Sequence, residues 1–173
     1  QMSKREGLFR EHLLFDKLTP LGGAQYLRQH VQRALDQATR EGQPLSLVVV
    51  DIDDFSAVNL MHGEAEGDHL LQVLAQLLLL NLRQQDVLCR LAGDRFVVVM
   101  PNTGETQARW LAEELQQAVA GLAYKTLRHG ERLHLRASVA AAMAYDDDVE
   151  GLLKRVNLGI AKAKRQAPRQ GAA

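Results

Sequence analysis

The feature that most constrains the fold is a short, mostly apolar run, Leu45-Ser46-Leu47-Val48-Val49-Val50-Asp51-Ile52. It is rich in β-branched residues and does not alternate regularly between apolar and polar, which is typical of a strand buried on both faces. A strand of this kind needs helices packed against each side of its sheet. The run therefore predicts an α/β domain built around a covered sheet.

Helical and strand patterns alternate along the rest of the chain. Apolar spacing predicts helices over 24–40, 55–61, 68–83, 106–122 and 147–166, and short apolar or alternating runs predict strands over 87–91, 96–100 and 133–139. The residues Ala92-Gly93-Asp94-Arg95 join two of these strands in a predicted hairpin. This order favours a central mixed, mostly antiparallel sheet flanked by helices, in a ferredoxin-like α/β arrangement.

The composition excludes several classes of function. Lysine plus arginine and aspartate plus glutamate both number 21, so the formal net charge is zero and no nucleic-acid partner is expected. The single cysteine, Cys89, excludes an internal disulfide framework and a multi-thiolate zinc site. Because the sequence has neither an apolar run of about 18 residues nor a signal-peptide pattern, we expect one cytoplasmic domain.

Three carboxylates fall at the ends of predicted strands. Asp51 ends the first strand, Asp53 follows it, and Asp94 lies in the hairpin turn. If those strands are neighbours, Asp51 and Asp94 meet and offer hard oxygen ligands to Mg²⁺, as in a nucleotidyl-transfer site. The alternative is that these aspartates cap helices and turns. The pattern favours capping more for Asp53 than for Asp51.

Asn59 and Asp68 lie on either side of Gly63 and Gly67. An aspartate accepts the N1 and N2 protons of guanine, and an asparagine amide pairs with O6 or N3, so the two side chains together could recognise a guanine edge. Asp68 equally suits the N-cap of the helix predicted over 68–83.

A resemblance to a known family rests on two stretches. The first half of a GGDEF (diguanylate cyclase) domain is similar to V-D-I-D-D-F-S-A-V-N-L-M-H-G-E-A-E-G-D, and its second half is similar to R-Q-Q-D-V-L-C-R-L-A-G-D-R-F. The family's opening motif resembles Asp16-Lys17-Leu18-Thr19-Pro20-Leu21. The resemblance implies a GGDEF fold, like that of nucleotidyl cyclases, over 16–168, with the end of a linker or signalling helix at 1–15 and a tail at 169–173.

In that family two domains, each with one GTP, meet head to head and make cyclic di-GMP with the help of Mg²⁺. The resemblance therefore implies a homodimer and an upstream sensor or membrane domain as partners. It implies that Asp51, the Ile52 carbonyl and Asp94 bind the metal, and that Asp94 is also catalytic. It further implies that Asn59 and Asp68 bind guanine and that Lys164 contacts phosphate.

The family signature is altered here. G-G-D-E-F becomes Ala92-Gly93-Asp94-Arg95-Phe96, so a permanent cation replaces an acid beside the metal position. With ~4 Å separation and an effective dielectric near ~20, each unit-charge pair there is worth roughly 4 kcal/mol. Because stabilisation of transition-state charge is usually the largest catalytic term, we predict that cyclase activity is lost or very weak and that Asp94 is vestigial. Arg95 could instead bind phosphate directly.

Arg83-x-x-Asp86 lies where family members carry the inhibitory site that binds cyclic di-GMP, and Arg90, which is close by in sequence, is predicted to bind the same ligand. An arginine fork grips phosphate or guanine, and an aspartate accepts from guanine N1 and N2. The alternative is an exposed ion pair at a helix end. Glu114 stands where family members often have a second arginine.

These observations favour a degenerate GGDEF domain that acts as a cyclic di-GMP receptor or regulatory module and that could still hold GTP. Two alternatives stay open. One is a weak but genuine diguanylate cyclase that tolerates Ala92 and Arg95, and the other is a protein-interaction module with neither site working.

Overall fold

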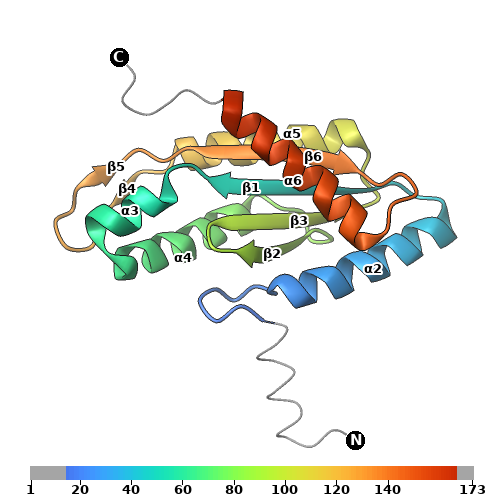
Figure 1. Cartoon of the computed structure of the whole chain (residues 1–173), viewed down its shortest axis with the longest axis horizontal. Coiled ribbons are helices and arrows are strands. Elements are labelled where there is room, and N and C mark those ends of the chain that lie inside the picture. The colour runs from blue at the N-terminus through green and yellow to red at the C-terminus, as the bar shows by residue number, and fades with distance from the viewer. Residues whose placement is uncertain (1–14, 167–173) are drawn as a thin grey trace, which may run out of the picture.

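A computed structural model describes residues 15–166. The tail expected at 169–173 and all of the linker expected at 1–15 except Phe15 lie outside these residues. The main sheet contains four strands: β1 (Leu45–Ile52), β2 (Val87–Ala92), β3 (Arg95–Pro101) and β6 (Ala137–Met143). They lie in the order β2-β3-β1-β6. Its three pairings are antiparallel. Strands β4 (Tyr124–Lys125) and β5 (Arg132–Leu133) form a separate small hairpin (Figure 1).

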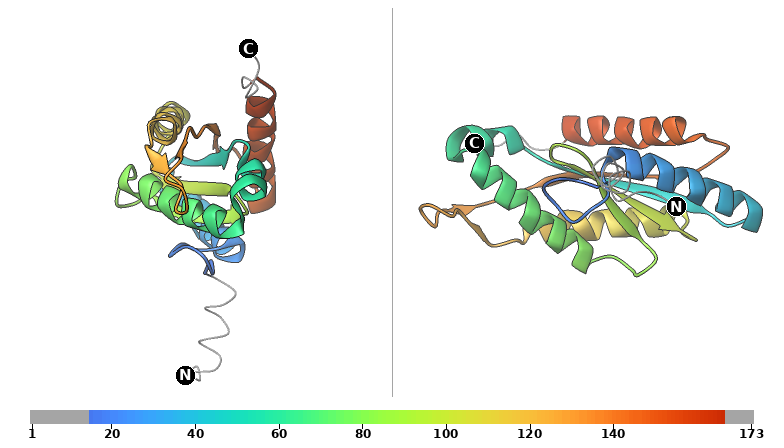
Figure 2. Two further views of the ribbon diagram at one scale, coloured as in Figure 1. Left: turned by 90° about the vertical axis from the view of Figure 1, so that its left-hand side faces the viewer. Right: turned by 90° about the horizontal axis from the view of Figure 1, so that it is seen from below.

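Helices cover both faces of the sheet, which confirms the predicted α/β class. Figure 2 shows α2 (Ala24–Glu41) and α6 (Val149–Gln166) on one side, and α4 (Glu64–Leu80) and α5 (Glu105–Ala120) on the other. A short helix, α3 (Phe55–His62), leads from β1 into α4. No helix within the described range 15–166 is both long and apolar enough to span a membrane.

The side chains of β1 alternate between two cores. Odd-numbered residues from Leu45 to Val49 pack beneath α2 and α6, and even-numbered residues from Val48 to Ile52 pack beneath α4 and α5. Every residue of β1 is buried, as predicted, and each buried valine or leucine contributes about 1.5–3 kcal/mol. Asp51 continues the odd-numbered series, so its side chain lies on the face covered by α2 and α6.

Two elements, α4 and β6, differ from the prediction by more than two residues at their ends. Helix α4 begins at Glu64, not Asp68, because Gly63 breaks the chain there with a φ of 90°. Strand β6 covers 137–143 instead of 133–139. Its alanines have weak strand propensity, but they let α6 approach closely: a Cβ built on Gly159 would lie 2.9 Å from Ala140 Cβ.

The first turn of the described chain lies along β2, which is an outermost strand of the main sheet. Gly22 bridges to Phe15 and to Cys89. The Arg90 N–H donates to the Gly22 carbonyl at 2.9 Å. The turn is therefore attached to β2 by backbone contacts as well as by side chains.

Candidate functional site

The carboxylate at the end of β1 faces a cation on β3. Asp51 lies directly opposite Arg95 in the antiparallel register, and opposed residues share one face of a sheet. Arg95 Nε and Nη2 donate to Asp51 Oδ2 at 2.8 and 2.5 Å. The side chain of Asp51 is 6% exposed and that of Arg95 is 29% exposed. The register and the burial together hold a charge-assisted pair that is largely shielded from water.

Helix α6 adds two polar side chains to this pair. Lys164 Nζ lies 3.2 Å from Asp51 Oδ1 and 3.5 Å from Asp53 Oδ1. Asn157 Oδ1, two turns earlier on the helix, accepts from Arg95 Nη1 at 3.1 Å. Burial alone would lower the pKa of Lys164, but the carboxylates of Asp51 and then Asp53 outweigh it and raise that pKa. Lys164, predicted to touch phosphate, therefore contacts carboxylates.

Asp53 is tied to β6. Ser138 Oγ donates to Asp53 Oδ1 at 2.7 Å, and the Asp53 N–H donates to the Arg136 carbonyl at 2.9 Å. Helix α3 begins after Asp54, whose side chain makes no capping hydrogen bond. The structure thus contradicts the capping alternative for Asp53, because its carboxylate serves β6 and α6.

Asp94 lies in the β2–β3 turn beside Asp51, as the sequence predicts. The Ile52 N–H donates to the Asp94 carbonyl at 3.2 Å, which holds the turn against the end of β1. Burial, followed by the negative charge of Asp51, raises the pKa of Asp94. The structure therefore brings Asp51, Ile52 and Asp94, the three positions predicted to hold a metal, to one place.

The contacts at this place do not fit Mg²⁺. A carboxylate must offer free lone pairs to the ion, but Asp51 Oδ2 accepts two guanidinium hydrogen bonds and Oδ1 faces the Lys164 ammonium. Mg²⁺ requires nearly octahedral oxygen ligands at about 2.0–2.1 Å. Over residues 15–166, no group of three histidine, cysteine, aspartate or glutamate side chains is arranged to hold a metal ion. The positively charged side chains of Arg95 and Lys164 therefore occupy the position at which the resemblance places a metal.

Of the two residues predicted to bind guanine, Asn59 packs against Gly67, and Asp68 follows Gly67 in α4. A Cβ built on Gly67 would lie 1.7 Å from Asn59 Oδ1 and 3.2 Å from the Phe55 ring, so glycine is required for α3 and α4 to approach this closely. Asp68 is exposed and lies inside α4, after the helix has begun at Glu64, so the N-cap alternative is wrong. An amide and an exposed carboxylate are thereby held on neighbouring helices, with the chemistry that a guanine edge requires.

Arg83 and Asp86 form a compact unit between α4 and β2. Asp86 accepts from the Arg83 N–H at 3.0 Å, from Nε at 3.1 Å and from Nη2 at 2.9 Å. Arg83 Nη2 also donates to Thr103 Oγ1 at 2.5 Å. The Asp86 side chain is fully buried, whereas that of Arg83 is 42% exposed, so the arginine is the accessible member of the pair. Thr103 carries no motif, and the sequence analysis missed it.

The side chain of Arg90 binds different residues from those that bind Arg83. Its Nη1 donates to the two carboxylate oxygens of Asp16 at 2.9 and 3.2 Å, and its Nε donates to the Gly93 carbonyl at 2.7 Å. These contacts join the first turn of the domain to the β2–β3 turn. They give Arg90 a different place from the Arg83 loop, although the two arginines are close in sequence.

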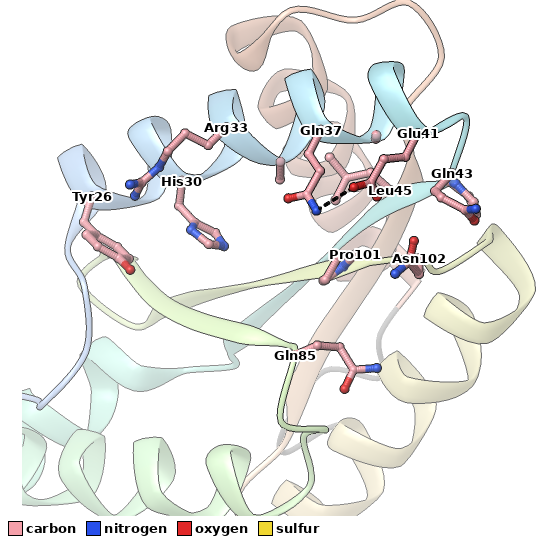
Figure 3. A pocket seen from close by; sticks show the side chains of 13 residues that line it. Tyr26, His30, Arg33, Gln37, Glu41, Gln43, Leu45, Gln85, Pro101 and Asn102 are labelled. Carbon is pink, nitrogen blue, oxygen red and sulfur yellow. Dashed lines mark hydrogen bonds between the residues drawn. The ribbon is translucent and has the colours of Figure 1, made fainter.

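A cavity of about 470 Å³ lies between α2 and the loops beside β2 and β3 (Figure 3). The Tyr26 and His30 rings on α2 stack with centroids 5.8 Å apart, and Arg33 follows on the same helix. Burial, and then the Arg33 charge, lower the pKa of His30, so its imidazole is neutral at pH 7. Gln85 lines the facing side and lies between Arg83 and Asp86. The cavity was not predicted, because its walls come from segments distant in sequence.

Known proteins match nearly the whole chain. The family model described as "Diguanylate cyclase, GGDEF domain" matches residues 13–170. The response regulator PleD of Caulobacter vibrioides is 36% identical over 152 residues, which are 86% of this chain and 33% of PleD. The diguanylate cyclase DosC of Escherichia coli is 30% identical over 162 residues, 93% of this chain and 35% of DosC. The chain spans about a third of the length of these curated relatives.

Solved structures share the fold. The active GGEEF domain of a diguanylate cyclase from Vibrio cholerae superposes with a TM-score of 0.76 and 28% identity, over 84% of this chain and 92% of that one. The coiled coil and GGDEF domain of DgcB from Caulobacter crescentus, in complex with c-di-GMP, superposes with a TM-score of 0.87 and 22% identity, over 94% of this chain and 87% of that one. Since the family match extends over both the Asp51 cluster and the Arg83 loop, the chain belongs to the diguanylate cyclase GGDEF domain family.

Proposed function

We propose that this domain acts in cyclic di-GMP signalling as a degenerate GGDEF domain, a receptor or regulatory module that makes little or no cyclic di-GMP itself. The observation that supports a loss of cyclase activity is the contact between Arg95 and Asp51. A bound metal would supply charge stabilisation during phosphoryl transfer. Here Asp51 pairs with Arg95 and Lys164 instead, and Lys164 also pairs with Asp53.

Binding of cyclic di-GMP is assigned to the Arg83 loop. Asp86 and Thr103 hold the Arg83 guanidinium through Nε and Nη2 while the side chain stays partly exposed. A pre-oriented guanidinium loses less entropy when Nη1, which these contacts do not use, binds a phosphate or a guanine. The adjoining cavity is lined by the stacked rings of Tyr26 and His30 and by the cationic Arg33. The GGDEF domain of DgcB was solved in complex with c-di-GMP, which supports binding of this ligand by the fold.

The guanine-binding pair is retained, so GTP is proposed to bind through Asn59 and Asp68 without being turned over. The close packing of Asn59 on Gly67 supports this proposal. In a longer protein the domain would receive its signal from an upstream sensor or membrane domain, in the cytoplasm, and a homodimer would be the assembly that responds.

Turnover of GTP tests the proposal. The protein at high concentration is incubated with GTP and Mg²⁺, and then with Mn²⁺, and products are separated by chromatography. We expect no cyclic di-GMP above a control without protein. Formation of cyclic di-GMP that disappears in Asp94→Ala would restore the alternative of a genuine diguanylate cyclase.

A further inference from the structure

We infer that Arg95 and Lys164 permanently replace a divalent cation at the end of β1, so that this site neither needs nor admits one. The inference concerns the resting site and does not depend on the proposed receptor function. It goes beyond the loss of a signature residue, because it states what has taken the place of the metal.

The β1–β3 register places the Arg95 cation on the Asp51 carboxylate. Asp51 and Arg95 are directly opposed, so the guanidinium must lie on the same face as the carboxylate unless the strands slip. A slip by one residue would move every side chain of β1 to the wrong core. The Arg95 side chain therefore stays beside Asp51 as long as the pairing of β1 with β3 is intact.

A third residue fixes the direction of the guanidinium. Asn157 Oδ1 accepts from Arg95 Nη1, while Nε and Nη2 are used by Asp51. Asn157 on α6 thus contacts Arg95 on β3 directly. A neutral amide orients the guanidinium without competing with Asp51 for its charge.

Charge balance explains why a divalent ion is excluded. Arg95 and Lys164 place two positive charges among the carboxylates of Asp51, Asp53 and Asp94, which leaves one uncompensated negative charge. An entering ion would have to displace both guanidinium hydrogen bonds from Asp51 Oδ2 and would meet two cations within a largely buried site. Mg²⁺ and Mn²⁺ gain too little from the remaining charge to do this.

Thermal unfolding without nucleotide tests the inference. Unfolding temperatures are measured in EDTA and in millimolar Mn²⁺ for the wild type, Arg95→Gln and Arg95→Gln/Asp51→Asn. We expect no Mn²⁺ effect on the wild type, a rise of about 2–4 °C for Arg95→Gln, and loss of that rise in the double variant. Arg155→Gln is the matched control, because Arg155 pairs with Asp147 near the other end of α6, and it should respond to Mn²⁺ like the wild type.

Two results would overturn the inference. One is Mn²⁺ stabilisation of the wild type that equals that of Arg95→Gln. The other is the absence of any Mn²⁺ effect in Arg95→Gln, which would show that Arg95 is not what excludes the ion. If Arg95→Gln fails to fold, electron paramagnetic resonance of Mn²⁺ with the wild type decides: free Mn²⁺ supports the inference, and one bound ion per chain that is lost in Asp51→Asn refutes it. None of these outcomes involves cyclic di-GMP, so the receptor proposal succeeds or fails separately.

Discussion

Asp16 and Arg90, 74 residues apart in sequence, form a partly buried ion pair in which Arg90 Nη1 donates to both carboxylate oxygens. Their side chains are 14% and 17% exposed. Thr19 donates to the same carboxylate through its N–H and its hydroxyl, both at 2.7 Å. Asp16 is therefore the junction that closes the first turn and fastens it to β2.

Asp16→Asn should destabilise the protein by about 1–3 kcal/mol at pH 7, because asparagine cannot replace a charged acceptor. Burial alone would raise the pKa of Asp16, but hydrogen bonds from Thr19 and the charge of Arg90 outweigh it and hold the pKa below its ordinary value of 3.8. A carboxylate with a depressed folded pKa contributes stability above its unfolded pKa and loses it as the pH falls through the folded pKa. The gap between wild type and variant should therefore shrink in acid below about pH 4.

Urea unfolding over a pH series measures this gap. Asp36→Asn is the control: Asp36 is an exposed aspartate that accepts from Gln32 on the same helix, and its replacement should change stability by less than about 0.5 kcal/mol. A gap for Asp16→Asn that stays constant into acid would contradict the assigned role of its charge.

Gly67→Ala should weaken guanine-nucleotide binding and destabilise the protein by about 1–3 kcal/mol, because the new methyl group would overlap Asn59 Oδ1. Gly104→Ala is the matched control, since a Cβ there meets nothing within 4 Å, and its effect should stay below about 1 kcal/mol. Thermal unfolding with and without GTP measures both effects. Equal behaviour of the two variants would refute the role of Gly67 in placing Asn59.

Tyr124→Phe should destabilise the protein by about 1–3 kcal/mol. The buried carboxylate of Glu66 accepts from the Tyr124 hydroxyl and, at 2.7 Å, from the Leu127 N–H, and the variant leaves it half unsatisfied. Burial, and then Glu66, raise the pKa of Tyr124, so the hydroxyl stays a donor well into base. Tyr145→Phe, at a 60% exposed tyrosine, is the control in chemical unfolding. Loss of equal size in both variants would mean that the Glu66 contact contributes nothing.

Arg83→Ala should lower the affinity for cyclic di-GMP by at least about tenfold, since one charge-assisted contact contributes roughly 1.5–3 kcal/mol. Arg109→Ala removes an exposed arginine that pairs with Glu105 within α5, and it should bind like the wild type. Calorimetric titration of cyclic di-GMP into the three proteins gives the comparison. Unchanged binding by Arg83→Ala would move the site elsewhere, and no binding by the wild type would favour the interaction-module alternative.

The sequence predicted what depends on local pattern. The apolar run of β1 revealed a doubly covered strand, and Asp51 near the end of this run led to the cluster with Asp94. Strand β6 was misplaced because its alanines are selected by contact with α6, which no local pattern records. Helix α4 was started too late because its polar first turn shows no apolar period.

The partners of the site residues were harder to predict. Whether Arg95 turns toward Asp51 or toward water depends on strand register, which the sequence fixes only through distant turns and cores. Thr103 beside Arg83, and Ser138 beside Asp53, come from strands and loops remote in the chain. The cavity lined by His30 and Gln85 has the same origin.

The bridge between Gly22 and β2 also bears on solubility. The free side of an outermost strand offers unpaired N–H and carbonyl groups, on which a second chain can add a strand and begin to aggregate. By accepting the Arg90 N–H and bridging to Cys89, Gly22 takes up part of that side. The first turn thus protects β2 from pairing with a strand of another molecule. A protein trimmed to begin at Ala24 would expose β2 as an edge strand that is prone to aggregation.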